Sequence, residues 1–237
     1  MIRKRLSAAL LPLDVFTGKP LRQRVLCKLD GLPLSCPVWK QDGWLVLSNL
    51  EPGEHRILSR CPGFQDTTIS LSGDVRTEEA VILNPGAGYA FPPDTVFLSL
   101  TLSGAPGAQS RVFAGMPKPN PLKLMRETEA GDSAVKMFVS GSAPRPGWFL
   151  LCGKATEAAF FRRVASDGAA ETASPLAEPH ARGEALIPAQ SFLVTAENAV
   201  RLPFQNPGTA YLFCRGKLKT VELREGEKQS LEWNLEV

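Results

Sequence analysis

The sequence has little of what catalysis needs. Histidine occurs only twice, as His55 and His180, and neither belongs to a recognisable set of three or four metal ligands. No glycine-rich loop is followed by Lys and Ser or Thr, and Ser140-Gly141-Ser142 lacks the residues of a nucleophile elbow. We therefore expect no enzymatic activity, no cofactor and no metal site.

Long apolar segments are missing as well. No stretch reaches the ~18 uncharged apolar residues of a membrane-spanning helix, so the sequence predicts no membrane insertion. Arg3-Lys4-Arg5 followed by Leu6 to Leu13 imitates a signal peptide, but the apolar segment is short, contains Pro12 and lacks a small-x-small cleavage site. We interpret this segment as the first strand and keep export as the alternative.

A strong charge of either sign is also absent. The formal net charge is +3, and the Lys and Arg residues form only small clusters. No aromatic residues alternate with a basic stripe, as they do in many nucleic-acid-binding surfaces. The sequence therefore predicts that nucleic acid is not a partner.

Cysteine pairs are missing too. The five cysteines are odd in number and scattered, with no Cys-x-x-Cys motif: Cys27, Cys36, Cys61, Cys152 and Cys214. Three of them, Cys27, Cys61 and Cys214, lie within or beside apolar strand-like segments, where a free thiol behaves as a small hydrophobe. We expect free thiols and folding in a reducing compartment.

Glycine and proline are abundant, with 20 of each, and this favours many short strands joined by tight turns. In the first part of the chain, β-type segments alternate with turn signals about ten residues apart, which is typical of a β-sandwich. The expected strands are 6–16, 25–29, 44–47, 55–60, 67–71 and 80–83. The predicted fold class is all-β.

Three turn motifs stand at the corners of these strands: Thr17-Gly18-Lys19-Pro20-Leu21, the stretch from Asp42-Gly43-Trp44 to Glu51-Pro52-Gly53, and Cys61-Pro62-Gly63-Phe64. In this order they resemble the turns of the carboxypeptidase regulatory-like domains, which share the transthyretin (prealbumin) type of β-sandwich. The resemblance covers residues 6 to 84. It implies an accessory, non-catalytic module with no active site.

A second copy of this pattern occurs later in the chain. Residues 43–60 align with residues 198–215, so that Leu47, Pro52, Gly53 and Arg60 recur as Leu202, Pro207, Gly208 and Arg215. We therefore expect tandem transthyretin-like (Ig-like) sandwiches. The first spans 1–88, the second spans 89–237 and is built from 96–115 and 195–237, and a β-rich insertion occupies 116–194.

Parts of the insertion allow more than one interpretation. Residues 122–129 could form a helical turn or a mobile loop, and 159–164 could be a strand or part of a short helix from Thr156. Segments 147–151, 175–177 and 183–188 are expected to be strands. The acidic residues Glu127, Glu129 and Asp132 fit a solvated loop better than a calcium loop.

The four tryptophans suggest a carbohydrate-binding platform as one use of the surface. Trp44 and Trp233 fall in expected strands, where burial in the core is the default. Trp39 and Trp148 lie near prolines and closer to loops, so they are the two candidate contact residues.

These observations together predict a non-enzymatic structural component that assembles with other protein subunits or with copies of itself. By elimination and by fold analogy, we expect it in a phage tail, a baseplate or a contractile injection particle. It would be made in the cytoplasm and incorporated in a virion or extracellular particle. The alternative is an exported adhesin or carbohydrate-binding module that uses Trp39 and Trp148.

Overall fold

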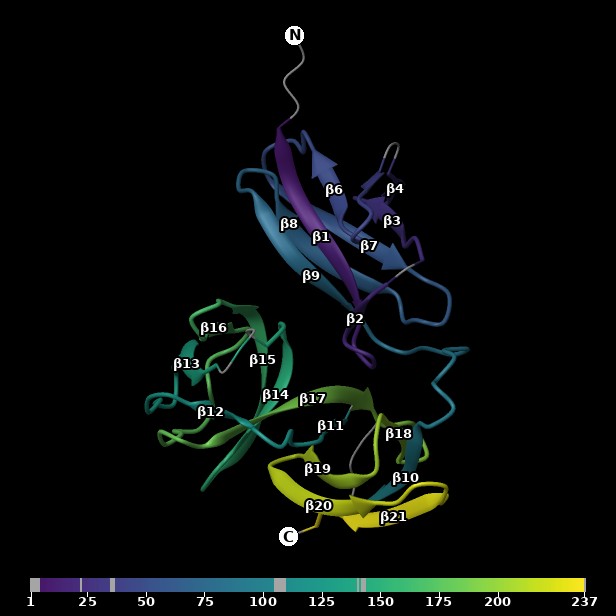
Figure 1. The fold of residues 1–237 in the computed structure, drawn as a ribbon, viewed down its shortest axis with the longest axis vertical. Helices are drawn as coiled ribbons and strands as arrows, with labels where there is room; N and C mark the ends of the chain where they lie inside the picture. Colours follow the sequence, from purple (N-terminus) through teal and green to yellow (C-terminus); the bar gives the residue numbers. More distant parts are fainter. Residues whose placement is uncertain are drawn as a thin grey trace. The chain divides into compact units, whose positions relative to one another are not determined.

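The computed structural model describes residues 5–21, 23–34, 37–104, 110–139, 141 and 144–236. It divides into two compact units, Met1–Phe91 and Pro92–Val237, and each is described by itself. Both units are built from strands (Figure 1), which confirms the predicted all-β class with tandem sandwiches. Among the residues described, no helix is long and apolar enough to cross a membrane.

The first unit is a two-layer sandwich. Strand β1 is the centre of one layer, and β7 is the centre of the other. The first layer contains β2 (Lys19–Pro20), β1 (Leu6–Asp14), β6 (Leu45–Ser48), β5 (Val38–Trp39) and β9 (Thr77–Leu83). The second contains β4 (Leu32–Pro33), β3 (Leu26–Leu29), β7 (Glu54–Arg60) and β8 (Thr67–Ser72). Alternating side chains such as Leu10, Leu45 and Ile57 fill the core between them.

The second unit contains a sandwich of the same kind. One layer is β18 (Ala199–Phe204), β10 (Val96–Ser103) and β21 (Gln229–Asn234). The facing strands are β11 (Arg111–Gly115), β19 (Gly208–Cys214) and β20 (Lys217–Leu223). Leu98, Val112, Leu202 and Leu212 are among the buried residues that form its core.

The two sandwiches share one topology. Strand β1 lies between β6, which is antiparallel to it, and β9, which is parallel; β10 lies in the same way between β18 and β21. Likewise β7 lies between β3 and β8, and β19 lies between β11 and β20. The corners before β7 and β19 carry Gly53 (φ 114°) and Gly208 (φ 128°), a backbone region open almost only to glycine.

The insertion extends the second layer of the second sandwich. Its strands are β12 (Leu122–Leu124), β13 (Ala134–Phe138), β14 (Gly147–Cys152), β15 (Thr156–Val164), β16 (Ala169–Thr172) and β17 (Ala185–Leu193). They run in the sheet order β12-β13-β16-β15-β14-β17, and β17 continues the sheet by pairing with β11. Because β17 pairs with β11 as β4 pairs with β3, the insertion occupies the place of the short β3–β4 turn. It has its own core, which includes Met137, Phe161 and Leu186.

Three local expectations for the insertion are corrected. Residues 122–129 form neither a helical turn nor an unpaired loop, because they contain β12 and a bridge from Thr128 to His180. The helix from Thr156 is a wrong alternative, because this segment is β15 and Phe161 stacks on Phe149 with ring centroids 4.7 Å apart. Residues 175–177 are not a strand, although the backbone of Leu176 is hydrogen-bonded to Asp132 and Gly131.

The segment after β9 is anchored to the first sandwich. The Tyr89 hydroxyl donates to Asp14 Oδ2 at 2.6 Å, and Asp14 Oδ1 accepts the Phe16 N–H at 2.8 Å. The Tyr89 ring also makes edge contacts with Phe64 and Phe91, at centroid distances of 5.1 and 4.6 Å. The chain therefore continues to pack on the first unit beyond residue 88, as far as Phe91.

Candidate functional site

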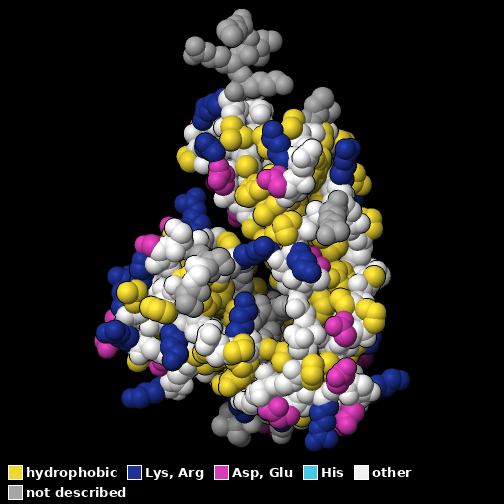
Figure 2. Space-filling view, in the orientation of Figure 1, with side chains coloured by type: hydrophobic (Ala, Val, Ile, Leu, Met, Phe, Trp, Pro, Cys, Tyr) yellow, Lys and Arg dark blue, Asp and Glu magenta, His cyan; other side chains and the backbone are white. Residues whose placement is uncertain are grey.

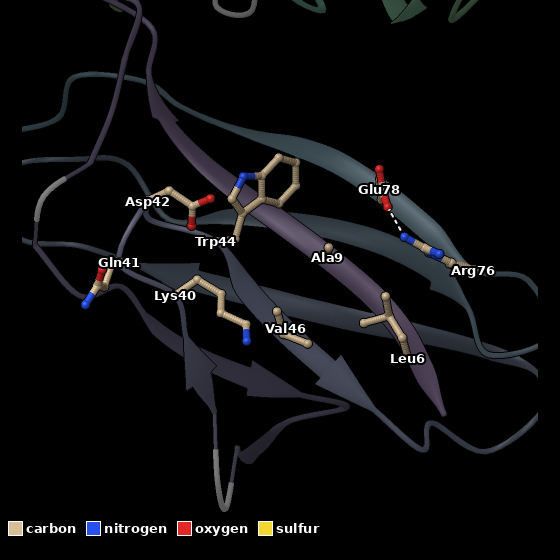
Figure 3. A pocket seen from close by; sticks show the side chains of 9 residues that line it. All are labelled: Leu6, Ala9, Lys40, Gln41, Asp42, Trp44, Val46, Arg76 and Glu78. Atoms are coloured by element: carbon tan, nitrogen blue, oxygen red, sulfur yellow. Dashed lines mark hydrogen bonds and ion pairs between the residues drawn. The ribbon is translucent and has the colours of Figure 1, made fainter. Parts of the chain in front are cut away.

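One shallow depression lies on the outer surface of the β9-β1-β6-β5 layer, and Figure 3 shows its lining. It measures about 670 Å³. Its floor is apolar and half-buried: Leu6, Ala9, Trp44 and Val46. Its rim is polar and exposed: Lys40, Gln41, Asp42, Arg76 and Glu78. We call this surface the outer face of the first sandwich.

Strand register brings the floor residues together. Ala9 on β1 lies opposite Val46 on β6 and opposite Glu78 on β9, while its neighbours Ala8 and Leu10 point into the core. As a result β1 is apolar on both of its faces. In a sheet with one face in water, inward apolar and outward polar residues would alternate; strands that are apolar on both faces are usually covered on both.

A tight hairpin places the rim beside Trp44. The Trp44 carbonyl accepts the Lys40 N–H at 2.8 Å, and the Lys40 carbonyl accepts the Gly43 N–H at 3.1 Å. Gly43 adopts φ 91°, which L side chains rarely adopt, and this closes the turn between β5 and β6. Figure 3 shows the Trp44 ring lying beside β1, with Asp42 and Lys40 on the hairpin next to it.

The rim carries both signs of charge in equal number. Lys40 and Arg76 are positive, Asp42 and Glu78 are negative, and Arg76 forms an ion pair with Glu78. A rim of balanced charge around an apolar floor is better suited to bind a partner whose surface is uncharged or of mixed charge than to bind a polyanion.

The equivalent surface of the second sandwich is polar. There the outward residues of the β21-β10-β18 layer include Ser99, Arg201 and Ser230, which lie opposite one another in register and are exposed. Arg201 is the position of the second copy that corresponds to Val46, and its guanidinium lies 3.7 Å from the centroid of the Phe97 ring. The apolar outer face is therefore a property of the first sandwich and not of the shared topology.

The prediction that Trp44 is a core residue is wrong. Trp44 precedes β6, but its side chain is half-buried on the outer face, whereas Trp233 is 6% exposed within the second core. Strand membership alone does not tell which face a residue occupies. Because side chains alternate between the two faces of a strand, a shift of one residue in the strand register moves a side chain from the core face to the outer face.

The two tryptophans predicted as contact residues are half-buried. Trp39 lies opposite Leu45 in the β5–β6 pair and packs against the first core. Trp148 lies against Phe113 and Phe160, at ring centroid distances of 4.6 and 5.4 Å. Neither lines the depression around Trp44, and their role as contact residues stays a prediction.

His180 lies in a buried ionic cluster within the insertion. Its Nε2 is 2.9 Å from Glu157 Oε1 and its Nδ1 is 2.8 Å from Glu184 Oε2, and its side chain is fully buried. The Glu157 carboxylate also accepts the backbone N–H groups of Ala177 and Glu178. Burial alone would lower the pKa of His180, but the two carboxylates outweigh it and raise that pKa.

The contacts of His180 are those of a structural cross-link between segments of the insertion, and not those of an acid–base pair. Both ring nitrogens of His180 lie within hydrogen-bond distance of a carboxylate oxygen, so each already has a partner other than a nucleophile. The nearby thiol of Cys152 is also unsuited to attack, because burial and the Glu184 charge raise its pKa to about 11. His180 instead joins β15, through Glu157, to the loop that leads into β17, through Glu184.

His55 has a similar structural role in the first sandwich. Its Nδ1 is 2.7 Å from Asp30 Oδ2, and its Nε2 lies 2.8 Å from the Glu51 carbonyl. These bonds join the β3–β4 turn to the corner before β7, and the hydrogen bond to Asp30 is the main cause of the raised pKa of His55. Neither histidine is grouped with enough ligands for a metal, within the ranges that the structure describes.

Four of the cysteines are free thiols: Cys27, Cys61, Cys152 and Cys214. Burial raises the pKa of the Cys27, Cys61 and Cys214 thiols, so they are protonated and behave as apolar packing groups. Cys36 lies outside the described residues.

No protein-family model matches the chain, and no curated protein matches its sequence. Among solved structures it is similar to a Streptococcal ancillary pilin, with a TM-score of 0.26, 11% identity, and coverage of 98% of this chain and 62% of that chain. It is also similar to BcpA, the major pilin subunit of Bacillus cereus (TM-score 0.27, 8% identity, coverage 98% and 99%). A third is GBS52, the minor pilin of Streptococcus agalactiae, with a TM-score of 0.22, 12% identity, and coverage of 96% of this chain and 95% of that chain.

Proposed function

We propose that this chain is a non-enzymatic structural component of a multisubunit assembly, and that a neighbouring protein subunit docks on the outer face of the first sandwich. The observation that carries the proposal is the apolar floor around Trp44 and Val46, where the second sandwich has exposed polar residues. Contiguous apolar surface with a charged rim is the usual composition of a protein–protein interface.

Other features of the molecule support a particular kind of assembly. The tandem sandwiches and the structural use of both histidines support a scaffold role. The free thiols support folding in a reducing cytoplasm, as expected for a particle assembled there before release. We therefore keep a phage tail, a baseplate or a contractile injection particle as the proposed setting. Membership of the carboxypeptidase regulatory-like family is part of the same proposal and rests on the turn motifs.

A matched pair of substitutions tests this function. Val46→Glu places a charge on the outer face of the first sandwich, and Arg201→Glu changes the corresponding position of the second. Tagged forms are expressed in the native host, captured, and the material is viewed by electron microscopy. We expect wild type and Arg201→Glu to be recovered in a particle and Val46→Glu to be recovered alone and folded. Equal incorporation of both variants would contradict the proposal.

A carbohydrate-binding module is the second candidate, and the position of Trp44 favours it. An indole face on an open surface beside Lys40, Gln41 and Asp42 offers both an apolar contact and hydrogen-bond partners for a sugar. Trp39 and Trp148 remain the further contact residues of this alternative. Titration of tryptophan fluorescence with a glycan panel decides it: saturable quenching that disappears in Trp44→Leu supports the module, and no change supports the docking face.

A further inference from the structure

A second depression, of about 850 Å³, lies on the insertion and is separate from the outer face of the first sandwich. This volume is within the roughly 300–1,000 Å³ of typical binding pockets. It is lined by residues of β13, β15, β16 and the segment after β12, including Met125, Arg126, Lys136, Arg163 and Glu171. Figure 2 shows Lys and Arg side chains gathered on the side of the insertion. We call it the basic depression.

The strand register explains how the charged residues meet. Lys136 on β13 lies opposite Ala169 on β16, and Glu171 lies between Ala134 on β13 and Arg163 on β15. The alternate residues, such as Val135 and Ala170, point into the core of the insertion. The charged residues therefore share the outward face of three neighbouring strands.

A β-bulge turns Arg163 toward this face. Phe161 is fully buried, and in a regular strand a residue two positions later would point the same way. The register shift between Phe161 and Arg163 breaks this alternation and leaves Arg163 exposed above the depression. Bulges that re-aim a side chain are common next to functional sites.

The charges of the basic depression are not balanced. Arg126, Lys136 and Arg163 line it together with one carboxylate, that of Glu171. Lys136 is bound to Asp167, but neither Arg126 nor Arg163 has an ion-pair partner in the described part of the chain. Two guanidinium groups are thus available to a ligand, and guanidinium pairs with carboxylate in a bidentate geometry.

The apolar part of the lining of the basic depression indicates that the ligand also has an apolar group. Met125 is 49% exposed at the depression, and the small side chains of Ala134, Ala165 and Ala169 leave room above the sheet. A flexible thioether adapts to an apolar side chain of a partner. Glu171 lies between Ala134 and Arg163 in register and repels any anion placed directly above it, so it excludes a continuous row of negative charges. A peptide with spaced carboxylates can instead offer a backbone N–H to the Glu171 carboxylate.

From these observations we propose that the basic depression binds an acidic peptide segment of a partner protein, in which carboxylates flank an apolar side chain. Arg126 and Arg163 pair with the carboxylates, and Met125 contacts the apolar residue. Nothing in this assignment depends on what covers the outer face of the first sandwich.

The test is fluorescence polarisation with the full chain and a labelled peptide of alternating Glu and Leu, alongside the same peptide with Gln in place of Glu. We expect saturable binding of the acidic peptide, weakened by salt, and none of the Gln peptide. The double variant Arg126→Glu/Arg163→Glu should weaken binding at least about tenfold. Arg182→Glu, an exposed charge elsewhere on the insertion, is the matched control and should change it less than about twofold.

Two further variants separate the apolar contact from the charged contacts, and this site from the outer face of the first sandwich. Met125→Ala should weaken binding while leaving its salt dependence unchanged, because it removes an apolar contact only. Val46→Glu should bind the peptide normally, which separates this site from the proposed docking function. The proposal is overturned if the acidic peptide does not bind, if the folded double variant binds as well as wild type, or if a single-stranded DNA oligonucleotide binds more tightly than the peptide.

Discussion

At the scale of single residues, His180 shows how a rare ionisable group can serve the fold. The imidazole is enclosed between Glu157 and Glu184, and all three side chains are buried or nearly so. For Glu157, burial alone would raise the pKa, but the hydrogen bond from His180 and those from the Ala177 and Glu178 N–H groups lower it. The charged forms of both partners are therefore favoured in the folded state.

This arrangement predicts a dependence of stability on pH. The raised pKa of His180 contributes stability that is complete below the ordinary histidine value, about 6.5, and is lost as the pH rises through the folded value. The lowered pKa of Glu157 contributes stability above the ordinary glutamate value, about 4.3, and it is lost as the pH falls through the folded value. We expect the free energy of unfolding of the second unit to decline in urea titrations as the pH rises above about 6.5.

Substitution of His180 tests the same cluster directly. His180→Ala leaves two buried carboxylates without their partner, so we expect the second unit to lose about 3–5 kcal/mol of stability near pH 6. A triple variant that combines His180→Leu with Glu157→Gln and Glu184→Gln should recover much of the loss, because no buried charge remains. A His180→Ala protein as stable as wild type under the same conditions would show that the cluster does not tie the insertion.

At the scale of elements, the repeated corner is the feature that the two sandwiches share most closely. Gly53 and Gly208 introduce β7 and β19 with φ angles of 114° and 128°. We expect Gly53→Ala to destabilise only the first unit and Gly208→Ala only the second, each by about 1–3 kcal/mol, because a Cβ is strained in this region. Hydrogen exchange of the two units, followed by mass spectrometry, would locate each effect. Effects that spread equally over both units would contradict independent sandwiches.

Most strands could be predicted from the sequence, because turn residues and alternation mark them locally. β1, β7, β8 and β14 lie close to their expected positions. The short β12 could not be predicted, because its three residues carry no periodicity and one of its two pairing partners, β17, is distant in the sequence. Residues 175–177 look apolar, which predicts a strand, but Leu176 is buried through a loop.

The candidate sites were less predictable than the strands. The continuous apolar character of β1 was visible in the sequence and is the one signal that could have identified the outer face. Placing Trp44 on that face required the register of β1 and β6, which the sequence does not fix. The bulge that exposes Arg163 and the contact of His180 with Glu157 likewise depend on tertiary pairing.

At the scale of the whole molecule, each sandwich has its own core and its own internal ties. The segment 84–91 belongs to the first of them, through Tyr89, Phe91 and the backbone bond from Gly86 N–H to the Gly63 carbonyl. We expect a fragment of residues 1–91 to fold by itself with a β-type circular dichroism spectrum. A fragment ending at residue 83 should be less stable by about 3 kcal/mol, because it loses the half-buried rings of Tyr89 and Phe91 and the hydrogen bond to Asp14. Equal thermal stability of both fragments would contradict this anchoring.

The central claim is that the outer face of the first sandwich is covered by another protein subunit. Site-specific photo-cross-linking in the native host tests it most directly, with the photoreactive residue placed at Val46 or at its counterpart Arg201. We predict a discrete cross-linked protein adduct from position 46 and none from position 201. Adducts from position 201 alone, or none from position 46 in assembled particles, would contradict the account.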